Sequence, residues 1–309
     1  MNAERRTISA STAWSAYRHK SGRKMARELL GLGFDAIELN VHVTQQMIED
    51  IHKMVKRGEI RISSLHNYCP LHEGMDPELA AGNAFPLSST DKDEHAEAVL
   101  RATKTIQWAG RLKASAVVFH LGLAPIEVHQ REILLLIGAG FREQAQELIA
   151  EALVERAKIY RPYLDAVISA LQELSIHAED EGVKLGLETR YCFYEIPTFD
   201  EFETIFESVS SPAVGYWHDT GHAHTMEHLG IAKQEDFLRR YGDRLVGMHI
   251  HDAVGASDHR AVGRGEIDFP AIIPYIKPDT VLVLEMHSHV SDKELARSKE
   301  AFQRLLIQG

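Results

Sequence analysis

The sequence predicts a single (β/α)8 TIM barrel that spans residues 1–309, with an extra helix and long loops after some strands. The chain has 309 residues, 44% of them hydrophobic, which suits one large α/β barrel with a full core. About eight short apolar or β-branched runs alternate with longer helical patterns, and eight strands close such a barrel. No internal repeat or linker divides the chain.

Each predicted strand is a short apolar or β-branched run. The runs lie near Thr7 to Ser11, Ala36 to Val41, Arg61 to Tyr68, Ser115 to Gly122, Val183 to Arg190, Val214 to Thr220, Leu245 to Asp252 and Thr280 to His287. Successive side chains of a strand point to opposite faces, so alternate residues of each run point into the barrel.

Helical patterns occupy most of the segments between these strands. They are predicted at Arg23 to Leu32, Thr44 to Arg57, Asp91 to Leu112, Arg142 to Glu181, Asp200 to Glu207, Lys233 to Tyr241 and Ser291 to Ile307. Asp91 and Glu94 predict a capping box, because each can satisfy a free backbone amide at a helix start. Arg161-Pro162 interrupts the fourth segment, which therefore predicts an extra helix before the usual barrel helix.

Two segments are too long to be simple connections. Cys69 to Thr90 follows the third strand and Leu121 to Phe141 follows the fourth. Both leave the barrel on the side where active sites form, so they are candidate lids or substrate-binding loops. The alternative is ordinary surface elaboration.

Composition indicates a soluble cytoplasmic protein. The formal charge of -11 and the pI of about 5.9 give no general reason to bind a nucleic-acid backbone. Cys69 and Cys192 are too few for a disulfide framework or a thiolate zinc site, and we expect free thiols. The N-terminus lacks an apolar signal region, and the longest apolar run, near Ile133 to Phe141, is too short to span a membrane.

Metal-capable side chains close six of the predicted strands. They are His66, His120, Glu188, Asp219, His249 and Glu285. Because the carboxyl ends of barrel strands meet at one rim, these side chains should converge on a common site. A lone histidine at a strand end is more often structural. Three carboxylates among imidazoles, however, would repel one another unless a cation held them, so the pattern predicts a divalent metal site.

Five ordered motifs share the pattern of a known barrel family. They are Leu187-Glu188-Thr189-Arg190, His218-Asp219-Thr220-Gly221-His222-Ala223, Met248-His249-Ile250-His251-Asp252, Gly263-Arg264-Gly265-Glu266-Ile267-Asp268 and Leu284-Glu285. Together they resemble the xylose isomerase-like TIM-barrel superfamily over nearly the whole chain. That superfamily includes sugar and sugar-phosphate isomerases and epimerases, inosose dehydratases, hydroxypyruvate isomerases and the three-zinc apurinic endonucleases of AP endonuclease family 2.

The resemblance implies one to three bound divalent ions. The ion shared by the isomerase and epimerase branches would be held by Glu188, Asp219, His249 and Glu285. This oxygen-rich set suits Zn, Mn, Co, Fe or Mg. Positions that hold a second ion in the endonuclease branch are matched by His66 and His120, with Glu188 as a bridge. Two of the three ligands of that branch's third ion are matched by His222 and His259.

The third ligand of that last ion departs from the endonuclease pattern. Ser257 stands where those enzymes have an aspartate, and the chain's own aspartate, Asp258, is next to His259. This change weakens the expected third site. The arginine- and aromatic-rich loop that such endonucleases insert into DNA is also not apparent in Asn40 to Gln46. Nucleic acid is therefore disfavoured as a partner.

The favoured function is a metal-dependent isomerase or epimerase acting on a sugar, a sugar phosphate or a related α-hydroxy carbonyl compound. The compound would chelate the metal and form an enediolate, while Glu188 and Glu285 remove and return the proton. Three alternatives stay open: metal-assisted phosphoester hydrolysis, dehydration of a cyclic polyol of the inosose type, and a non-catalytic sugar-binding module. A homo-oligomer is compatible with the sequence.

Other residues are predicted to support the site. Arg190 shares the inward face with Glu188, where it would grip the substrate or orient a ligand carboxylate. Inward-pointing side chains with substrate-contacting, ligand-supporting or plain structural roles are Glu38, His251 and His287. Trp217 would form a sugar-stacking wall or fill the barrel. Arg264 is a candidate substrate-binding residue, and His218 is expected to be structural. No role is assigned to His224.

Overall fold

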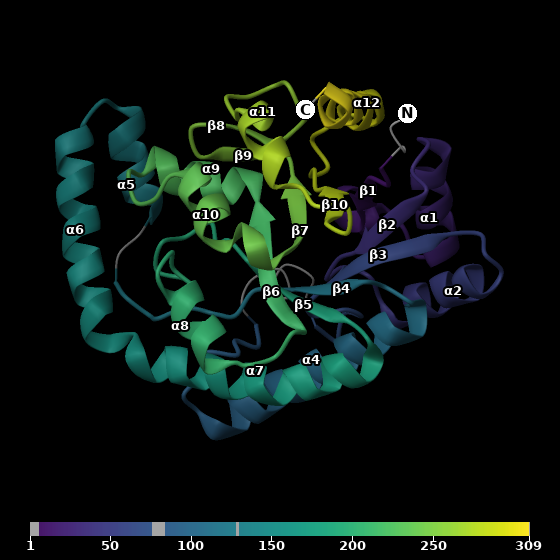
Figure 1. Cartoon of the computed structure of the whole chain (residues 1–309), viewed down its shortest axis with the longest axis horizontal. Coiled ribbons are helices and arrows are strands. Elements are labelled where there is room, and N and C mark those ends of the chain that lie inside the picture. The colour runs from purple at the N-terminus through teal and green to yellow at the C-terminus, as the bar shows by residue number, and fades with distance from the viewer. Residues whose placement is uncertain (1–5, 76–83, 128–129, 309) are drawn as a thin grey trace.

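The computed structural model describes residues 6–75, 84–127 and 130–308. Eight parallel strands close into a barrel in the order β1-β10-β7-β6-β5-β4-β3-β2 (Figure 1). They are β1 Ser9–Ser11, β2 Ala36–Leu39, β3 Arg61–His66, β4 Ala116–Phe119, β5 Lys184–Glu188, β6 Val214–Asp219, β7 Leu245–Ile250 and β10 Val281–Leu284. Each lies within one of the eight predicted runs, so the predicted fold class is confirmed.

An antiparallel hairpin interrupts the barrel pattern after β7. It consists of β8 (Asp252–Val254) and β9 (Ser257–Arg260). Gly255, in the turn, has a φ of +56°, a conformation that favours glycine. The sequence did not predict this hairpin, because neither strand shows the apolar run by which the barrel strands were recognised. Its position matters, since β9 carries Asp258 and His259.

The helices surround the barrel. They are α1 Gly22–Gly31, α2 Gln45–Lys56, α4 Lys92–Leu112, α5 Gln130–Gly138, α6 Arg142–Ile159, α7 Arg161–Glu181, α8 Glu201–Ser208, α9 Thr220–His228, α10 Gln234–Tyr241, α11 Phe269–Ile272 and α12 Asp292–Gln308. The predicted break at Arg161-Pro162 is confirmed, with Pro162 in the first turn of α7. The extra helix is thus α6.

The predicted capping box at α4 is only half correct. The Asp91 carboxylate does accept hydrogen bonds from the backbone N–H groups of Asp93 and Glu94, at 2.9 and 3.0 Å. The Glu94 side chain, however, accepts from the hydroxyl of Ser89, and the Asp91 N–H donates to that same hydroxyl oxygen. A serine therefore occupies the place that the box would give to the glutamate.

The long segment after β4 is not the irregular loop that we expected over residues 121–141. It contains α5, whose buried Ile133 and Ile137 face the body of the protein. α9 and α11 were also not predicted. Most of the other long segment, residues 69–90, is described, but residues 76–83 lie outside the described part of the chain.

The interior of the barrel is filled by side chains. Trp217 is completely buried there and packs with Ala116, Val118 and Val283. Gly247 makes room for its ring, because a Cβ atom at this position would lie 2.2 Å from the indole. The barrel is therefore a packed core, and any ligand must bind at its rim.

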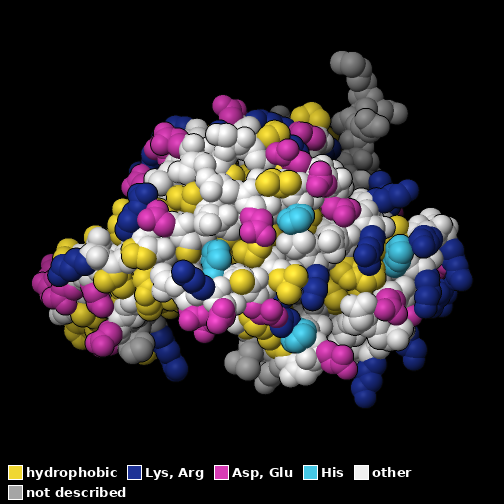
Figure 2. Space-filling view, turned by 90° about the horizontal axis from the view of Figure 1, so that it is seen from below, with side chains coloured by type: hydrophobic (Ala, Val, Ile, Leu, Met, Phe, Trp, Pro, Cys, Tyr) yellow, Lys and Arg dark blue, Asp and Glu magenta, His cyan; other side chains and the backbone are white. Residues whose placement is uncertain are grey.

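One end of the molecule extends beyond the barrel. α5 and α6 project at the left of Figure 1, and Leu135, Phe141 and Val154 in this region are largely exposed. On the face shown in Figure 2, acidic and basic side chains are interspersed with scattered apolar ones. Among the described residues, no helix has the length and apolar character needed to cross a membrane.

Candidate functional site

Seven metal-capable side chains gather where the barrel strands end. Five belong to strands and two directly follow strands: Glu38, His66, His120, Glu188, Asp219, His249 and Glu285. The pairing of β6 with β7 sets Asp219 beside His249, and all seven stand at carboxyl ends. The structure thus brings together the six residues that the strand-end pattern singled out, and adds Glu38.

The central group consists of Glu188, Asp219, His249 and Glu285. One donor atom from each lies within 4.8 Å of the others, and all four side chains are buried. Nδ1 of His249 lies 2.5 Å from a Glu188 oxygen, 3.0 Å from a Glu285 oxygen and 3.7 Å from an Asp219 oxygen. Three carboxylates converging on one imidazole nitrogen form a donor set that fits a divalent cation with a preference for oxygen ligands.

The pKa shifts in this group show that its carboxylates favour a positive charge between them. Burial alone would raise the pKa of the Glu188 carboxyl, but His120 and His249 hold it well below its usual value. Burial would lower the pKa of His249, yet the carboxylates of Glu285, Glu38 and Glu188 raise it well above its usual value. The Glu188 carboxylate therefore stays ionised, and the group favours a cation, either a proton on the imidazole or a metal.

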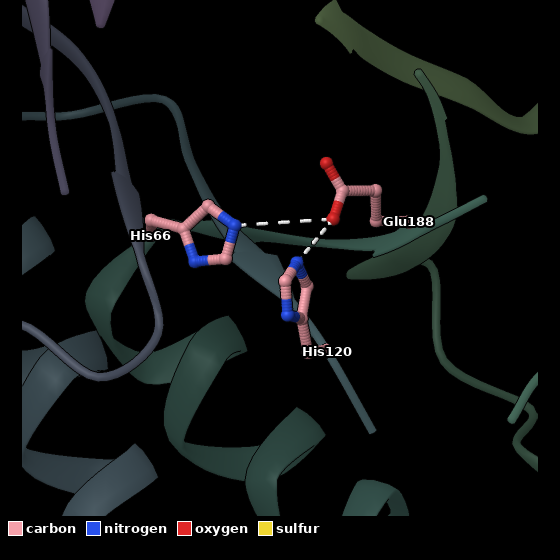
Figure 3. Close-up of side chains that lie close together, drawn as sticks. All are labelled: His66, His120 and Glu188. Carbon is pink, nitrogen blue, oxygen red and sulfur yellow. Dashed lines mark ion pairs between the residues drawn. The ribbon is translucent and has the colours of Figure 1, made fainter. Parts of the chain in front are cut away.

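A second group shares Glu188 with the first. Oε2 of Glu188 lies 2.5 Å from Nε2 of His120 and 3.8 Å from Nε2 of His66 (Figure 3). Burial, reinforced by the Arg190 charge, lowers the pKa of His120 to about 3, so its imidazole is neutral at pH 7 and stabilises the Glu188 carboxylate through a hydrogen bond. A neutral imidazole is the form that binds metals. This group could hold a second ion with Glu188 as the bridge.

A third group lies beside the first on α9 and β9. It consists of His222, Asp258 and His259, whose donor atoms also lie within 4.8 Å of one another. An Asp258 oxygen lies 3.0 Å from Nδ1 of His259, and the other lies 3.8 Å from Nε2 of His222. The sequence predicts that Ser257 weakens this third site, and the strength of ion binding there stays a prediction. The β8–β9 hairpin does place the carboxylate of the neighbouring Asp258 beside both histidines.

Buried partners orient two of the predicted ligands, the ring of His249 and the carboxylate of Asp219. The Glu38 carboxylate accepts from Nε2 of His249, with its oxygens 3.0 and 3.1 Å away, and directs Nδ1 to the central group. His251 contacts the Asp219 carboxylate at 3.0 and 3.1 Å through its Nε2. Both residues thus contact predicted ligands, and such contacts orient ligands and tune their basicity.

A family model gives the relationship of the chain to known proteins. The model of the xylose isomerase-like TIM barrel matches residues 26–306. The chain belongs to this family. It is 30% identical over 149 residues to the uncharacterized protein MJ1311 of Methanocaldococcus jannaschii, a match that covers 46% of this chain and 49% of the relative. The chain therefore matches about half the length of that relative.

Solved structures share the xylose isomerase-like barrel at low sequence identity. A D-tagatose 3-epimerase-like protein is 21% identical, with a TM-score of 0.70 and coverage of 98% of both chains. The IOLI protein, with a binding zinc atom, is 15% identical, with a TM-score of 0.66 and coverage of 98% of this chain and 99% of that one. These likenesses show a common fold over almost the whole length.

Arg190 lies beside the central group as a salt-bridge partner. One guanidinium nitrogen is 2.8 Å from a Glu188 oxygen and another is 2.8 Å from a Glu195 oxygen. The geometry therefore favours the ligand-orienting role among the two that the sequence left open. Glu195 was missed, because it lies in the irregular segment after β5, where strand alternation gives no signal.

The other predicted residues lie farther from this centre. Trp217 offers no exposed surface to a substrate and fills the barrel beneath His249, with ring centroids 5.1 Å apart. Arg264 is exposed on the turn after β9, and none of its described contacts reaches the three groups. His218 lies on the opposite face of β6 and is hydrogen-bonded to the Tyr216 hydroxyl at 2.7 Å, as expected of a structural residue.

Two more histidines complete the surroundings. The His287 ring stacks on that of His259, with centroids 3.7 Å apart, so it borders the third group. His224 lies on α9 with its Nε2 3.5 Å from a Glu266 oxygen, and it belongs to none of the metal-capable groups found among the described residues. His287 therefore borders the third group, whereas His224 lies away from the metal-capable groups.

Proposed function

We propose that the chain is a metal-dependent isomerase or epimerase acting on a sugar, a sugar phosphate or a related α-hydroxy carbonyl compound. The observation that carries this proposal is the approach of Glu188 and Glu285 to one point. Their carboxylate oxygens lie 2.5 and 3.0 Å from Nδ1 of His249. The two residues come from β5 and from the end of β10, which are not neighbours in the barrel, so the carboxylates enter the same space from different sides.

The residues present fit a divalent ion. It would be held by Glu188, Asp219, His249 and Glu285. When bound, such an ion polarises a substrate carbonyl and thereby acidifies the adjacent C–H bond. Mn, Mg, Co, Fe and Zn all accept a donor set of this composition.

The chain itself would supply the proton transfers. Glu188 and Glu285, one on each side of the substrate carbon, would remove the α-proton and return it to the other face or to the neighbouring carbon. Arg190 keeps Glu188 oriented through a direct salt bridge. The choice between the two return sites decides between epimerisation and isomerisation.

Two structural neighbours support a carbohydrate substrate and a bound metal. One is described as a D-tagatose 3-epimerase-like protein and another as containing a zinc atom. Both have barrels of the same fold at low identity. Fold similarity alone leaves the reaction open, so the argument depends on the paired carboxylates.

The test is exchange of the α-proton in deuterium oxide. Ketohexoses, their phosphates and inososes would be incubated with purified, metal-loaded protein and followed by NMR. Glu188→Gln and Glu285→Gln should each lower exchange and turnover by about 10²- to 10⁴-fold, the usual range for a lost acid–base group. Glu132→Gln, at an exposed position of α5, is the control and should leave them unchanged. Normal turnover in Glu188→Gln would refute the proton-transfer scheme. Separately, the NMR spectra of the products would distinguish a dehydration from an isomerisation.

A second candidate function is metal-assisted phosphoester hydrolysis. The specific observation in its favour is Asp258, which completes a third group with His222 and His259. Elemental analysis of the purified protein distinguishes the candidates, because the hydrolytic scheme needs two or three ions. Cleavage of DNA at abasic sites, without α-proton exchange in any sugar, would favour the hydrolase.

A further inference from the structure

A buried arginine on the extra helix contacts the loop that supports the candidate site. The Arg156 side chain, on α6, is 7% exposed. Its guanidinium donates hydrogen bonds to the backbone carbonyls of Tyr194 and Glu195, both at 3.2 Å. It also forms a two-bond fork with the carboxylate of Glu201, at 2.6 and 2.9 Å. The Arg156–Glu201 pair therefore joins α6, the loop and the start of α8.

The loop in question, residues 191–200, lies between β5 and α8 and contains no helix or barrel strand. Glu201 accepts a hydrogen bond from the Thr198 N–H at 2.9 Å, so the Arg156–Glu201 pair contacts both halves of the loop. The Glu195 carboxylate accepts from the Cys192 N–H at 2.9 Å and from Arg190 at 2.8 Å. Arg190 in turn donates to Glu188 at 2.8 Å. A continuous series of buried polar contacts thus runs from Arg156 to Glu188.

We infer that Arg156 is a positioning residue for Glu188, acting through Glu195 and Arg190 without touching the site itself. The inference rests on the proposed role of Glu188. A site of this kind requires its groups to be held within about 0.5 Å of the productive geometry. Removal of Arg156 would leave the Tyr194 carbonyl with the hydrogen bond from the Ala124 N–H, at 3.2 Å. The carbonyl of Glu195 would lose its bond to Arg156, so Glu195, and with it Arg190, could shift.

The packing around the loop gives it room to move. A cavity of about 480 Å³ borders the loop and is lined by Arg156, Arg190, Phe193, Thr198 and Glu201, among other residues. On the side that borders this cavity, the loop is held by the hydrogen bonds of Arg156. Elsewhere Ile196 is buried, and its N–H donates to the Gly122 carbonyl at 2.9 Å. The opposite side is held by Gln130, whose side chain bonds the backbones of residues 191 and 193.

The test compares Arg156→Met with a matched variant of a buried cation elsewhere. Lys299 has a relative exposure of 6%, and its ammonium contacts the carbonyl of Gly33, which precedes β2 at the other end of the barrel. Lys299→Met should lower stability without affecting the site. Arg156→Met should weaken Mn²⁺ binding, measured by calorimetry on full-length protein, by about 10-fold, as expected when a ligand loses its support.

Turnover gives a second readout. With a sugar substrate of the wild type, Arg156→Met should lower kcat by about 10-fold with KM little changed, because it displaces a reacting group and leaves the substrate contacts intact. In an Arg190→Met background, Arg156→Met should add less than twofold, because effects along one path are not additive. Arg156→Lys, which keeps the charge next to Glu201, should fall in between and provides a folded variant if Arg156→Met does not fold.

Several results would overturn the inference. If the Arg156 variants bind Mn²⁺ and turn over substrate as Lys299→Met does, Arg156 only stabilises the fold. If the effects of Arg156→Met and Arg190→Met add in full, the path through Arg190 is wrong. If the wild type turns over no sugar, the proposed function fails, while the Mn²⁺ measurements still decide the role of Arg156.

Discussion

Replacement of Glu38 by glutamine tests how the central group is built. Glu38 is completely buried at the end of β2, and its only role visible in the structure is to contact other side chains. It accepts from Nε2 of His249 and, at 2.7 Å, from the hydroxyl of Ser64. A carboxylate can only accept, so it fixes the proton on Nε2 and leaves Nδ1 free to bind a metal.

The expected magnitude follows from these contacts. Loss of a carboxylate behind a metal-binding histidine usually lowers metal affinity by about 10- to 100-fold, which corresponds to about 1.4–2.7 kcal/mol. We expect the Glu38→Gln variant to lie at the upper end. Glutamine cannot supply the charge, and both carboxylate oxygens are within 3.1 Å of Nε2 of His249.

The assay is a competition between the protein and a fluorescent chelator for Zn²⁺ and Mn²⁺. Ser64→Ala provides a graded comparison, because it removes one hydrogen bond to Glu38 and leaves the carboxylate in place. It should weaken binding by less than Glu38→Gln does, because the charge that orients His249 remains. Circular dichroism would verify that both variants are folded.

Equal metal affinity in Glu38→Gln and the wild type would refute this reasoning. It would mean that the ring of His249 is held by packing, for example against Trp217, and needs no charged partner. A loss as large in Ser64→Ala as in Glu38→Gln would also contradict it, because the hydroxyl would then carry the effect.

Three further predictions concern metal removal, packing and pH. Treatment with EDTA should lower the melting temperature measured in calorimetric scans. Excess Mn²⁺ at about 100 times its Kd should restore about 2.7 kcal/mol of the free energy of unfolding. Asp219→Asn should abolish this response to the metal. Gly247→Ala should destabilise the protein by about 1–3 kcal/mol in urea unfolding, because its Cβ would collide with Trp217. Trp217→Leu should relieve this loss. If the destabilising effects of the two substitutions add in the double variant, the collision is not the cause. Burial would lower the pKa of His251, but Asp219 raises it to about 9. In EDTA-treated protein, the stabilisation that protonated His251 gains from Asp219 is fully present below about pH 6.5 and is lost as pH rises through about 9. The melting temperature should therefore decline between these pH values, and His251→Asn should flatten that decline. Parallel declines in the variant and the wild type would disprove the attribution to His251.

The barrel and its central group were predictable because both depend on periodic features. Apolar runs marked all eight barrel strands, and a closed parallel barrel necessarily brings the ends of its strands to one rim. Glu188, Asp219 and His249 could therefore be placed together without knowledge of any distance. Their proximity in the structure, within 4.8 Å, follows from the strand order and register.

The supporting residues were not predictable because they come from irregular or short elements. Glu195 lies in a loop, and Arg156 sits in a helix where nothing distinguishes it from its charged neighbours. α9 was missed because it starts directly after β6 and has Gly221, a poor helix former, in its first turn. Asp219 nevertheless caps this helix by accepting from the His222 N–H at 2.7 Å.

The charge of the site connects the number of bound ions to the kind of substrate. Four carboxylates surround His249, namely Glu38, Glu188, Asp219 and Glu285. One divalent ion that replaces the proton on His249 offsets half of this charge, and Arg190, paired with Glu188, offsets one further unit. The site that remains has no excess of positive charge and suits an uncharged sugar. The other two groups consist mainly of imidazoles, so ions bound there would add positive charge with little to balance it. Such a centre would attract phosphate esters, and the measured metal content therefore indicates which class of substrate the barrel binds.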